Sequence, residues 1–375
     1  MAEGRGSPFF GTGEDVNDTA TGTASPPVAA PSSSLERGAD VPRTEHPNPI
    51  FRREPWLTLN GRWRFTFDPQ DAGEQGRWHR LPHPAARPDQ QAERALAGLD
   101  FEPGRATRAE DPFRAEIVVP FPWESRLSGV GDTSYKGAAW YQRVIEVPAE
   151  WAHPGAPPPM AEEPAGLESA GDAAAGSAAP GAGVRWRLRP YVCFGAVDWS
   201  AKVWVNGRFV GEHAGGYTPF ALDVSRYVRP GRAATLTVRA WDTSAADTPI
   251  GKQVERWYTH SGGIWQPVWL EGRPEAHITR IQITTTSPET GAADFEIGVR
   301  RDLDPADEIA SAGNGAPPAY TLRVTSDDGA FPDAEAPVTL AGGEAVARLR
   351  VEVPRPRLWS PEDPHLYDCV VTLTP

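Results

Sequence analysis

Acidic and aromatic side chains are the groups in this sequence that could do chemistry. The 375 residues include 50 Asp and Glu and 14 Trp. Paired carboxylates hydrolyse glycosidic bonds when a rigid scaffold holds them roughly 5 to 10 Å apart. Tryptophan presents an apolar face with a polar N–H, which suits a sugar ring. No spacing in the sequence singles out two such carboxylates, so the candidates for a site are binding residues in loops.

The loop 251–263, GKQVERWYTHSGG, is the first candidate binding segment. It carries basic, amide and aromatic side chains: Lys252, Gln253, Trp257, Tyr258 and His260. Binding residues favour loops carried by a rigid scaffold. The alternative is a solvent-exposed loop that binds no ligand.

The segment 131–137, GDTSYKG, is a second candidate, because Asp132, Tyr135 and Lys136 could line a cleft. A third is Trp265, in the stretch HSGGIWQPVWLEG. In this stretch apolar residues alternate onto both faces, which predicts a strand covered on both sides. Pro267 removes a ladder hydrogen bond and predicts an edge or bulged strand. A structural role is favoured for Trp269 and Trp265, with a sugar platform at Trp265 as the alternative.

The sequence contains little evidence for a metal or cofactor site. His79 and His83 are separated by three residues, but Pro82 interrupts the segment and no cysteine pair accompanies them. The acidic run 302–308 could hold calcium, although a solvated loop is the simpler interpretation. Glycine-rich nucleotide motifs and the G-x-S-x-G elbow are absent from the sequence. We therefore expect no metal and no cofactor.

Charge and composition exclude several classes of protein. The net charge is −13 (37 basic, 50 acidic residues), whereas nucleic-acid binding needs a basic stripe. No apolar run reaches the length of a membrane span, and the first residues lack the apolar core of a signal peptide. The two cysteines, Cys193 and Cys369, exclude a disulfide framework and fit buried thiols in a cytoplasmic protein.

The chain is predicted to be all-β. Residues 1–45 have the composition of a disordered tail, and 151–183 is a low-complexity insert rich in Ala, Pro and Gly, predicted to lengthen a hairpin. From Arg62 to Phe67 aromatic residues alternate with polar ones, which predicts a half-buried strand after a hairpin turn at Asn60–Gly61. Tryptophans in such strand-like runs are predicted to be core residues: Trp63, Trp140, Trp199, Trp204 and Trp241.

A hairpin is predicted around Asn206–Gly207, the residue pair most typical of a two-residue turn. In this register Val205 faces Arg208, Trp204 faces Phe209 and Val203 faces Val210. Many short strands with turn signals indicate a β-sandwich over 46–275. Five further strand-like segments between 276 and 375 predict a second, smaller sandwich of the immunoglobulin-like kind.

Five sequence words, in order, resemble the N-terminal half of glycoside hydrolase family 2, which includes β-galactosidases, β-glucuronidases and β-mannosidases. They are WLTLNGRWRF, FPWESRLSGVGD, WYQRVIEVP, FGAVDWSAKVWVNGRFVGEHAGGYTPFALDVSRYV and GGIWQPVWLEG. The segment RLWSPEDPHLYDCVVTL resembles the family's exit from its immunoglobulin-like domain. The resemblance implies a jelly-roll, sugar-binding-type domain followed by an immunoglobulin-like domain.

The resemblance also implies that the catalytic glutamates lie in a barrel that would begin near Pro375, and the family's Asn-Glu pair is absent here. No catalytic residue can be carried over. We expect the non-catalytic part of a β-glycosidase, with a carbohydrate as its partner and a homo-oligomer allowed. The alternatives are a free-standing carbohydrate-binding protein and a structural or interaction module.

Overall fold

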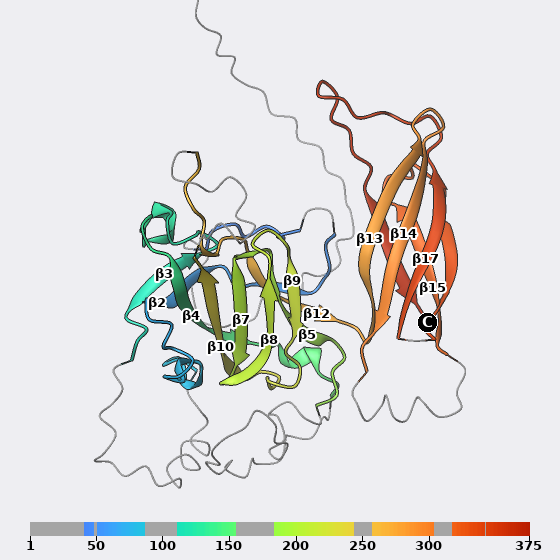
Figure 1. Ribbon diagram of the computed structural model, residues 1–375. Coiled ribbons are helices and arrows are strands. Elements are labelled where there is room, and N and C mark those ends of the chain that lie inside the picture. Colours follow the sequence, from blue (N-terminus) through green and yellow to red (C-terminus); the bar gives the residue numbers. More distant parts are fainter. Residues whose placement is uncertain are drawn as a thin grey trace, which may run out of the picture. The chain divides into compact units, whose positions relative to one another are not determined.

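The structure is a computed structural model that describes residues 41–48, 51–86, 111–154, 184–243, 257–303, 317–341 and 343–375. In these segments the chain forms 18 strands and three short 3-10 helices (Figure 1). The predicted all-β fold is therefore confirmed. Most of the predicted tail, and the insert from residue 155 onward, lie outside the described residues.

The first sandwich has a sheet of six antiparallel strands in the order β3-β2-β4-β10-β7-β8. The bounds are β2 Gly61–Asp68, β3 Ala115–Val119, β4 Gly137–Glu146, β7 Ser200–Val205, β8 Arg208–Ala214 and β10 Ala233–Asp242. Alternation sends Trp63 and Phe65 of β2 into the core, as the sequence predicted.

The opposing sheet has four strands in the order β1-β12-β5-β9, and β6 and β11 form a separate pair. The bounds are β1 Trp56–Thr58, β5 Arg189–Phe194, β6 Val197–Asp198, β9 Phe220–Asp223, β11 Gly263–Ile264 and β12 Val268–Arg273. The 3-10 helices in the connections are η1 Trp78–Arg80, η2 Arg126–Ser128 and η3 Ala149–Trp151. Side chains from both sheets, such as Phe65 and Phe194, fill one apolar core between them.

The second sandwich has two sheets of three strands, β13-β14-β17 and β16-β15-β18. The bounds are β13 Ala276–Ser287, β14 Ala292–Arg301, β15 Ala319–Ser326, β16 Ala334–Thr339, β17 Glu344–Glu352 and β18 Cys369–Thr374. Its core is separate from the first and includes Phe295, Ile297, Leu322 and Val324. Five of these strands match the predicted ones; β16 was missed, because AEAPVT contains a proline and little apolar alternation.

Two turn predictions were wrong. Asn60–Gly61 does not close a hairpin, because β1 pairs with β12 whereas β2 pairs with β3 and β4. The Asn60 side chain instead donates to the Pro42 and Arg43 carbonyls and accepts from the Val268 backbone N–H at 2.9 Å. The hairpin predicted across the insert fails for the strands, because β4 and β5 belong to different sheets; the flanks of the insert do pair, in one antiparallel bridge between Ala152 and Trp186.

The hairpin at Asn206–Gly207 is confirmed, with Val205 opposite Arg208 and Trp204 opposite Phe209. Both turn residues have positive φ, 50° and 76°, as this turn requires. The third predicted pair is wrong, because Val203 lies opposite Gly211. A bulge inserts one extra residue at this point and shifts the register.

The stretch around Pro267 is covered on both faces, as predicted, but it is not one strand. Residues 265–267 separate β11 from β12, and β12 lies inside its sheet between β1 and β5. Leu270 faces the main core, and Trp269 packs with Tyr191 and Cys193 on the other face. Pro267 lies between the two strands, so its missing N–H costs no hydrogen bond of the sheet. Its carbonyl accepts from the Gly195 N–H at 2.9 Å.

Candidate functional site

Asp132 serves its own turn. Its Oδ1 accepts from the Ser134 hydroxyl at 2.7 Å, the Ser134 N–H at 2.8 Å and the Tyr135 N–H at 3.1 Å. The hydrogen bonds from Ser134 lower the pKa of the Asp132 carboxyl. These contacts give Asp132 a structural role, because a side chain that closes a turn in this way has its acceptor oxygen occupied.

Tyr135 is likewise engaged within the protein. Its hydroxyl donates to the Ala138 carbonyl and accepts from the Asp68 N–H at 3.2 Å. Its ring stacks on Phe67 with a centroid distance of 3.7 Å and lies against Trp123 at 5.8 Å. Burial raises the pKa of Tyr135 to about 12. The ring therefore closes the end of the core instead of offering a free face.

The loop that leads into β11 carries the exposed aromatic residues. Trp257 and Tyr258 are 75% and 61% exposed. His260 is half-buried, and its Nδ1 is enclosed without a hydrogen-bond partner among the described residues. Lys252 and Gln253, predicted for the same loop, lie outside the described residues. The described part thus presents two apolar rings to solvent.

Trp265 joins this loop to the turn after β8. Its Nε1 donates to the Gly216 carbonyl at 2.7 Å, and its ring meets the Tyr217 ring edge-on at 5.7 Å. Tyr217 is 52% exposed, and Trp265 is half-buried. The segments 216–217 and 257–265 carry four exposed or half-buried aromatic residues, of which Tyr217 and Trp265 are in contact: Tyr217, Trp257, Tyr258 and Trp265. We call these four residues the aromatic wall.

A buried carboxyl group binds the loop that carries Trp257 and Tyr258, and the sequence analysis missed it. Glu124, in the segment between β3 and η2, is 7% exposed. Its two oxygens accept from the Gly262 N–H at 3.0 and 3.1 Å. Burial raises the pKa of Glu124 to about 8; the nearby Asp242 and Asp198 carboxylates add to the rise and the Gly262 N–H opposes it. The sequence offered one signal, an acidic residue directly after the apolar run FPW.

Glycines let three segments meet around Glu124. A Cβ on Gly262 would lie 1.9 Å from the Trp123 ring, and one on Gly263 would lie 2.0 Å from the Tyr141 hydroxyl. Gly263 pairs with Asp198 across β11 and β6, and a Cβ on Gly216 would lie 2.2 Å from Asp198 Oδ1. Such approaches are open only to glycine. The GG of THSGGIW and the second G of AGGY are therefore spatial requirements of this end of the sandwich.

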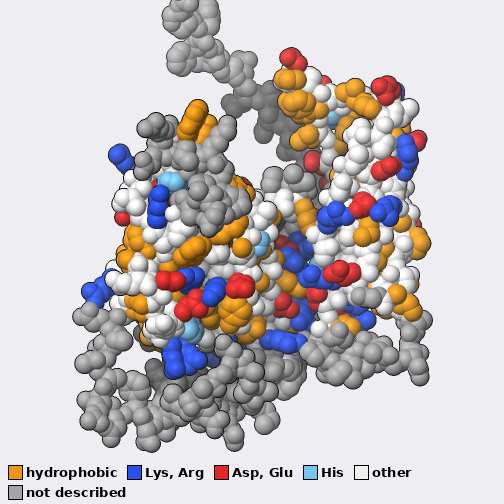
Figure 2. All heavy atoms as spheres, viewed as in Figure 1, with side chains coloured by type: hydrophobic (Ala, Val, Ile, Leu, Met, Phe, Trp, Pro, Cys, Tyr) orange, Lys and Arg blue, Asp and Glu red, His pale blue; other side chains and the backbone are white. Residues whose placement is uncertain are grey.

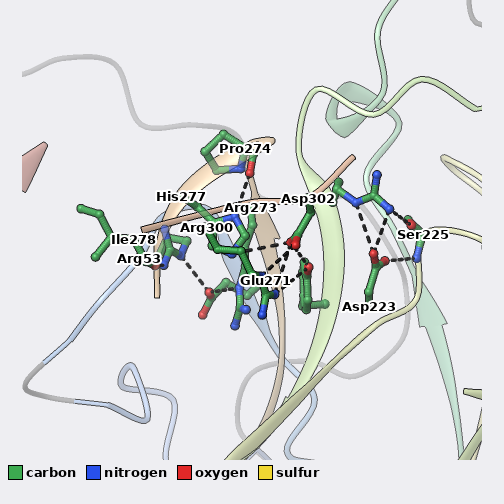
Figure 3. A network of polar contacts seen from close by, with 12 residues as sticks. Arg53, Asp223, Ser225, Glu271, Arg273, Pro274, His277, Ile278, Arg300 and Asp302 are labelled. Atoms are coloured by element: carbon green, nitrogen blue, oxygen red, sulfur yellow. Dashed lines mark hydrogen bonds and ion pairs between the residues drawn. The ribbon is translucent and has the colours of Figure 1, made fainter. Parts of the chain in front are cut away.

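A second polar cluster involves Arg53, β12 and the start of β13 (Figure 3). Glu271 accepts from Arg53 Nε at 2.9 Å and from Arg273 Nε at 2.8 Å. Burial opposes ionisation of Glu271, but the Arg273 and Arg53 guanidiniums outweigh it and lower the pKa of the carboxyl. Arg53 also donates to the Ile278 carbonyl.

The same cluster continues through Asp302, which accepts from the Tyr191 hydroxyl and from Arg300 Nε at 2.8 Å. His277, fully buried beside it, bonds through Nδ1 to the Pro274 carbonyl at 3.1 Å. Burial lowers the pKa of His277, so the ring is neutral at neutral pH. Each charge drawn in this cluster has an opposite charge beside it, which indicates a structural junction between β5, β12, β13 and β14.

The metal alternatives find no support. In the part of the chain that the structure describes, no three His, Cys, Asp or Glu side chains are arranged to hold a metal ion. His79 stacks on Trp204 at 5.2 Å, and the His83 ring accepts from the Ala85 N–H at 3.1 Å. Of the acidic run, Asp302 belongs to the junction, and the other members lie outside the described residues. Both cysteines are free; Cys193 is buried, whereas Cys369 is half-buried.

Two family models match the chain in direct succession. Residues 184–274 match the sugar binding domain of glycosyl hydrolases family 2, and residues 276–375 match a second model of the same family. The chain belongs to glycoside hydrolase family 2. The first match contains β5 to β12. It also contains Trp265 of the aromatic wall and the two glycines that accept or donate backbone hydrogen bonds nearby, Gly216 and Gly262.

Curated relatives named β-glucuronidase and β-galactosidase are similar over most of this chain. The β-glucuronidase of Canis lupus familiaris is 26% identical over 320 residues, which are 76% of this chain and 39% of that protein. The β-galactosidase of Pectobacterium atrosepticum is 24% identical over 359 residues, 92% of this chain and 28% of that protein. The chain thus spans less than half the length of these relatives.

Solved structures of β-glucuronidases show the same fold. A β-glucuronidase of Bacteroides uniformis matches with a TM-score of 0.53 and 21% identity, covering 85% of this chain and 30% of that one. A β-glucuronidase of Ruminococcus gnavus in complex with uronic deoxynojirimycin matches with a TM-score of 0.51 and 17% identity, covering 87% and 44%. At these identities the likeness establishes the architecture.

Proposed function

We propose that this chain is the non-catalytic, sugar-binding part of a β-glycosidase that hydrolyses O-glycosyl bonds. The observation that carries the proposal is the direct succession of two family 2 matches, 184–274 and 276–375, which take in β5 to β12 of the first sandwich and all of the second. Relatives named β-glucuronidase and β-galactosidase are similar over 76% and 92% of the chain. The substrate class is therefore a carbohydrate with a β-linked sugar.

The aromatic wall is the proposed carbohydrate contact. Trp257 and Tyr258 project from one loop, and Tyr217 projects from the turn that Trp265 holds by its indole hydrogen bond. Aromatic rings supply large apolar contact area on few rotatable bonds, and they sit here on loops anchored by a rigid sandwich. Of the predicted site residues, Trp257, His260 and Trp265 belong to this proposal. Asp132 and Tyr135 do not, because their polar groups close the 132–138 turn.

The chemistry itself is not assigned to this chain. Retaining glycosidases use two carboxyl groups about 5 to 5.5 Å apart with the sugar between them. Glu124 and its neighbours Asp198 and Asp242 are 7%, 1% and 2% exposed, so a sugar does not reach these carboxyl groups. The chain is therefore proposed to supply scaffold and one wall of a substrate cleft.

Two assays test the proposal. Purified chain 1–375 should release no nitrophenol from p-nitrophenyl β-D-galactoside or β-D-glucuronide, and turnover abolished by an active-site-directed inhibitor would overturn the non-catalytic assignment. Isothermal titration with methyl β-D-galactoside and methyl β-D-glucuronide should give weak binding that Trp257→Ala removes. Equal binding by Trp257→Ala would show that the sugar contacts another surface.

A free-standing carbohydrate-binding protein is the second candidate. The 75% exposure of Trp257 favours it, because a large apolar ring in water indicates a partner surface. The two candidates differ in affinity: a free-standing module should bind a sugar tightly as the isolated chain, whereas one wall of a cleft should bind it only weakly.

Assembly and location are further proposals. Figure 2 shows acidic and basic side chains interspersed over the visible face. Exposed hydrophobic side chains lie in the segment between β17 and β18, where Leu358, Trp359 and Leu366 are more than half exposed. This segment is the proposed contact of a homo-oligomer, which sedimentation velocity of the wild type and Trp359→Ser would test. The free thiols support a cytoplasmic location. The described part holds no helix long and apolar enough to cross a membrane.

A further inference from the structure

Glu124 binds the loop 257–262 at its last residue, Gly262. Glu124 reaches it from a segment 138 residues earlier in the chain and places both oxygens at 3.0 and 3.1 Å from the Gly262 nitrogen. We propose that Glu124 is the positioning residue of this loop, and that its hydrogen bond to Gly262 sets where Trp257 and Tyr258 stand. The inference rests on the proposed carbohydrate function of the aromatic wall.

Gly262 lies where the loop enters the packed interior of the sandwich. Gly262 is buried, and the Trp123 ring fills the space where a side chain would be. The next residue, Gly263, enters β11, so the main chain is held by pairing from there on. On the other side, Trp257 and Tyr258 are exposed. Glu124 therefore stands at the boundary between the anchored strand and the exposed part of the loop.

The ionisation state of Glu124 is coupled to this bond. The groups that face it are the Asp198 carboxylate of β6, the Asp242 carboxylate at the end of β10 and the Tyr141 hydroxyl of β4, with His260 two residues from the bonded glycine. Burial, with the two carboxylates, raises the pKa of Glu124 to about 8. An ionised acceptor makes a shorter and stronger hydrogen bond than a neutral one. The Gly262 N–H should therefore report the titration of Glu124 directly.

The sequence allows this one amide to be observed. Only two Ser-Gly pairs occur in the chain, Ser128–Gly129 and Ser261–Gly262. Cell-free labelling with carbonyl-¹³C serine and ¹⁵N glycine leaves two signals in an HNCO spectrum of the full chain. Gly129 is an internal control, because its N–H donates to the Arg126 carbonyl and not to a carboxyl group.

We expect the Gly262 signal to move with a midpoint near pH 8 as the pH rises from 6 to 9.5, while Gly129 stays in place. Glu124→Gln keeps an acceptor oxygen but does not titrate, so its Gly262 signal should not move. Glu116→Gln, at an exposed pair with Arg62, should behave as wild type. A Gly262 signal that is flat in wild type, or that moves equally in Glu124→Gln, would overturn the proposal.

The rate of chymotrypsin cleavage after Trp257 and Tyr258 measures how firmly the loop is held in place. Cleavage there, identified by mass spectrometry at fixed pH, should accelerate at least tenfold in Glu124→Ala and return to near the wild-type rate in Glu124→Gln. Equal rates in all three proteins would also overturn the proposal. The Gly129 signal shows whether each variant is folded. Neither readout contains a sugar, so a failure of the carbohydrate proposal is seen separately, in the titrations with methyl glycosides.

Discussion

Arg53 and Glu271 form a buried ion pair across 218 residues of sequence, with 2.9 Å between Nε and Oε1. Their side chains are 14% and 8% exposed. Arg53 also donates to the Ile278 carbonyl, so one guanidinium contacts both β12 and β13. The pair therefore ties an N-terminal segment to the place where one core ends and the other begins.

Removing one partner of this pair should be costly. Arg53→Ala leaves Glu271 with Arg273 alone, and a lost hydrogen bond to a charged group costs about 1.5 to 3 kcal/mol. Arg52→Ala is the matched control, because the neighbouring Arg52–Glu54 pair is 63% and 58% exposed and such pairs contribute less than about 1 kcal/mol. Urea unfolding followed by circular dichroism measures both variants; equal losses would show that Arg53 is not a junction residue.

Glu124 should make stability fall as the pH rises. Its pKa is about 8 in the folded chain, above the ordinary 4.5, so between these values the folded state binds more protons than the unfolded state. Stability therefore decreases with pH in this window, by up to about 1.4 kcal/mol per pH unit, and levels off above pH 8. Glu124→Gln should lack this component. Unfolding midpoints of wild type and Glu124→Gln are measured at pH 6, 7, 8 and 9. If the two proteins show the same dependence of stability on pH, the prediction is contradicted.

Gly262→Ala should be destabilising for steric reasons alone. The added Cβ would lie 1.9 Å from the Trp123 ring, and forcing atoms into a packed core costs about 1 to 3 kcal/mol. The control is Gly329→Ala, where φ is 70° but no atom lies within 4 Å, so only backbone strain of about 1 kcal/mol remains. Differential scanning calorimetry should rank Gly262→Ala as the less stable variant. The reverse order would mean that Trp123 moves aside freely.

Substitutions of the two tryptophans of the aromatic wall should differ in their effect on stability, because Trp265 is hydrogen-bonded and Trp257 is exposed. Trp265→Phe loses the indole bond to the Gly216 carbonyl, at about 0.5 to 1.5 kcal/mol. Trp257→Ala removes a ring that is 75% exposed and should change stability by less than about 0.5 kcal/mol. Thermal melts of both variants give the comparison. A large loss in Trp257→Ala would place that ring in a packed contact.

Local patterns predicted much of the architecture. The alternation in β2 and the Asn206–Gly207 turn act within a few residues, and both were confirmed, as was the burial of Trp63, Trp140 and Trp204. Trp199 and Trp241, predicted with them, are half-buried. The turn at Asn60–Gly61 failed, because the partners of the two strands come from distant parts of the chain.

The candidate site also depends on contacts between parts of the chain that are distant in sequence. The all-β fold could be predicted from the sequence, because strand periodicity and turn chemistry are local properties. The family entered separately, through the resemblance of five sequence words to glycoside hydrolase family 2. Only the tertiary structure assigned Asp132 and Tyr135 to a turn and brought Glu124 to Gly262. A carboxyl group acquires its pKa and its partner from burial and from neighbours distant in sequence, and no local pattern contains either.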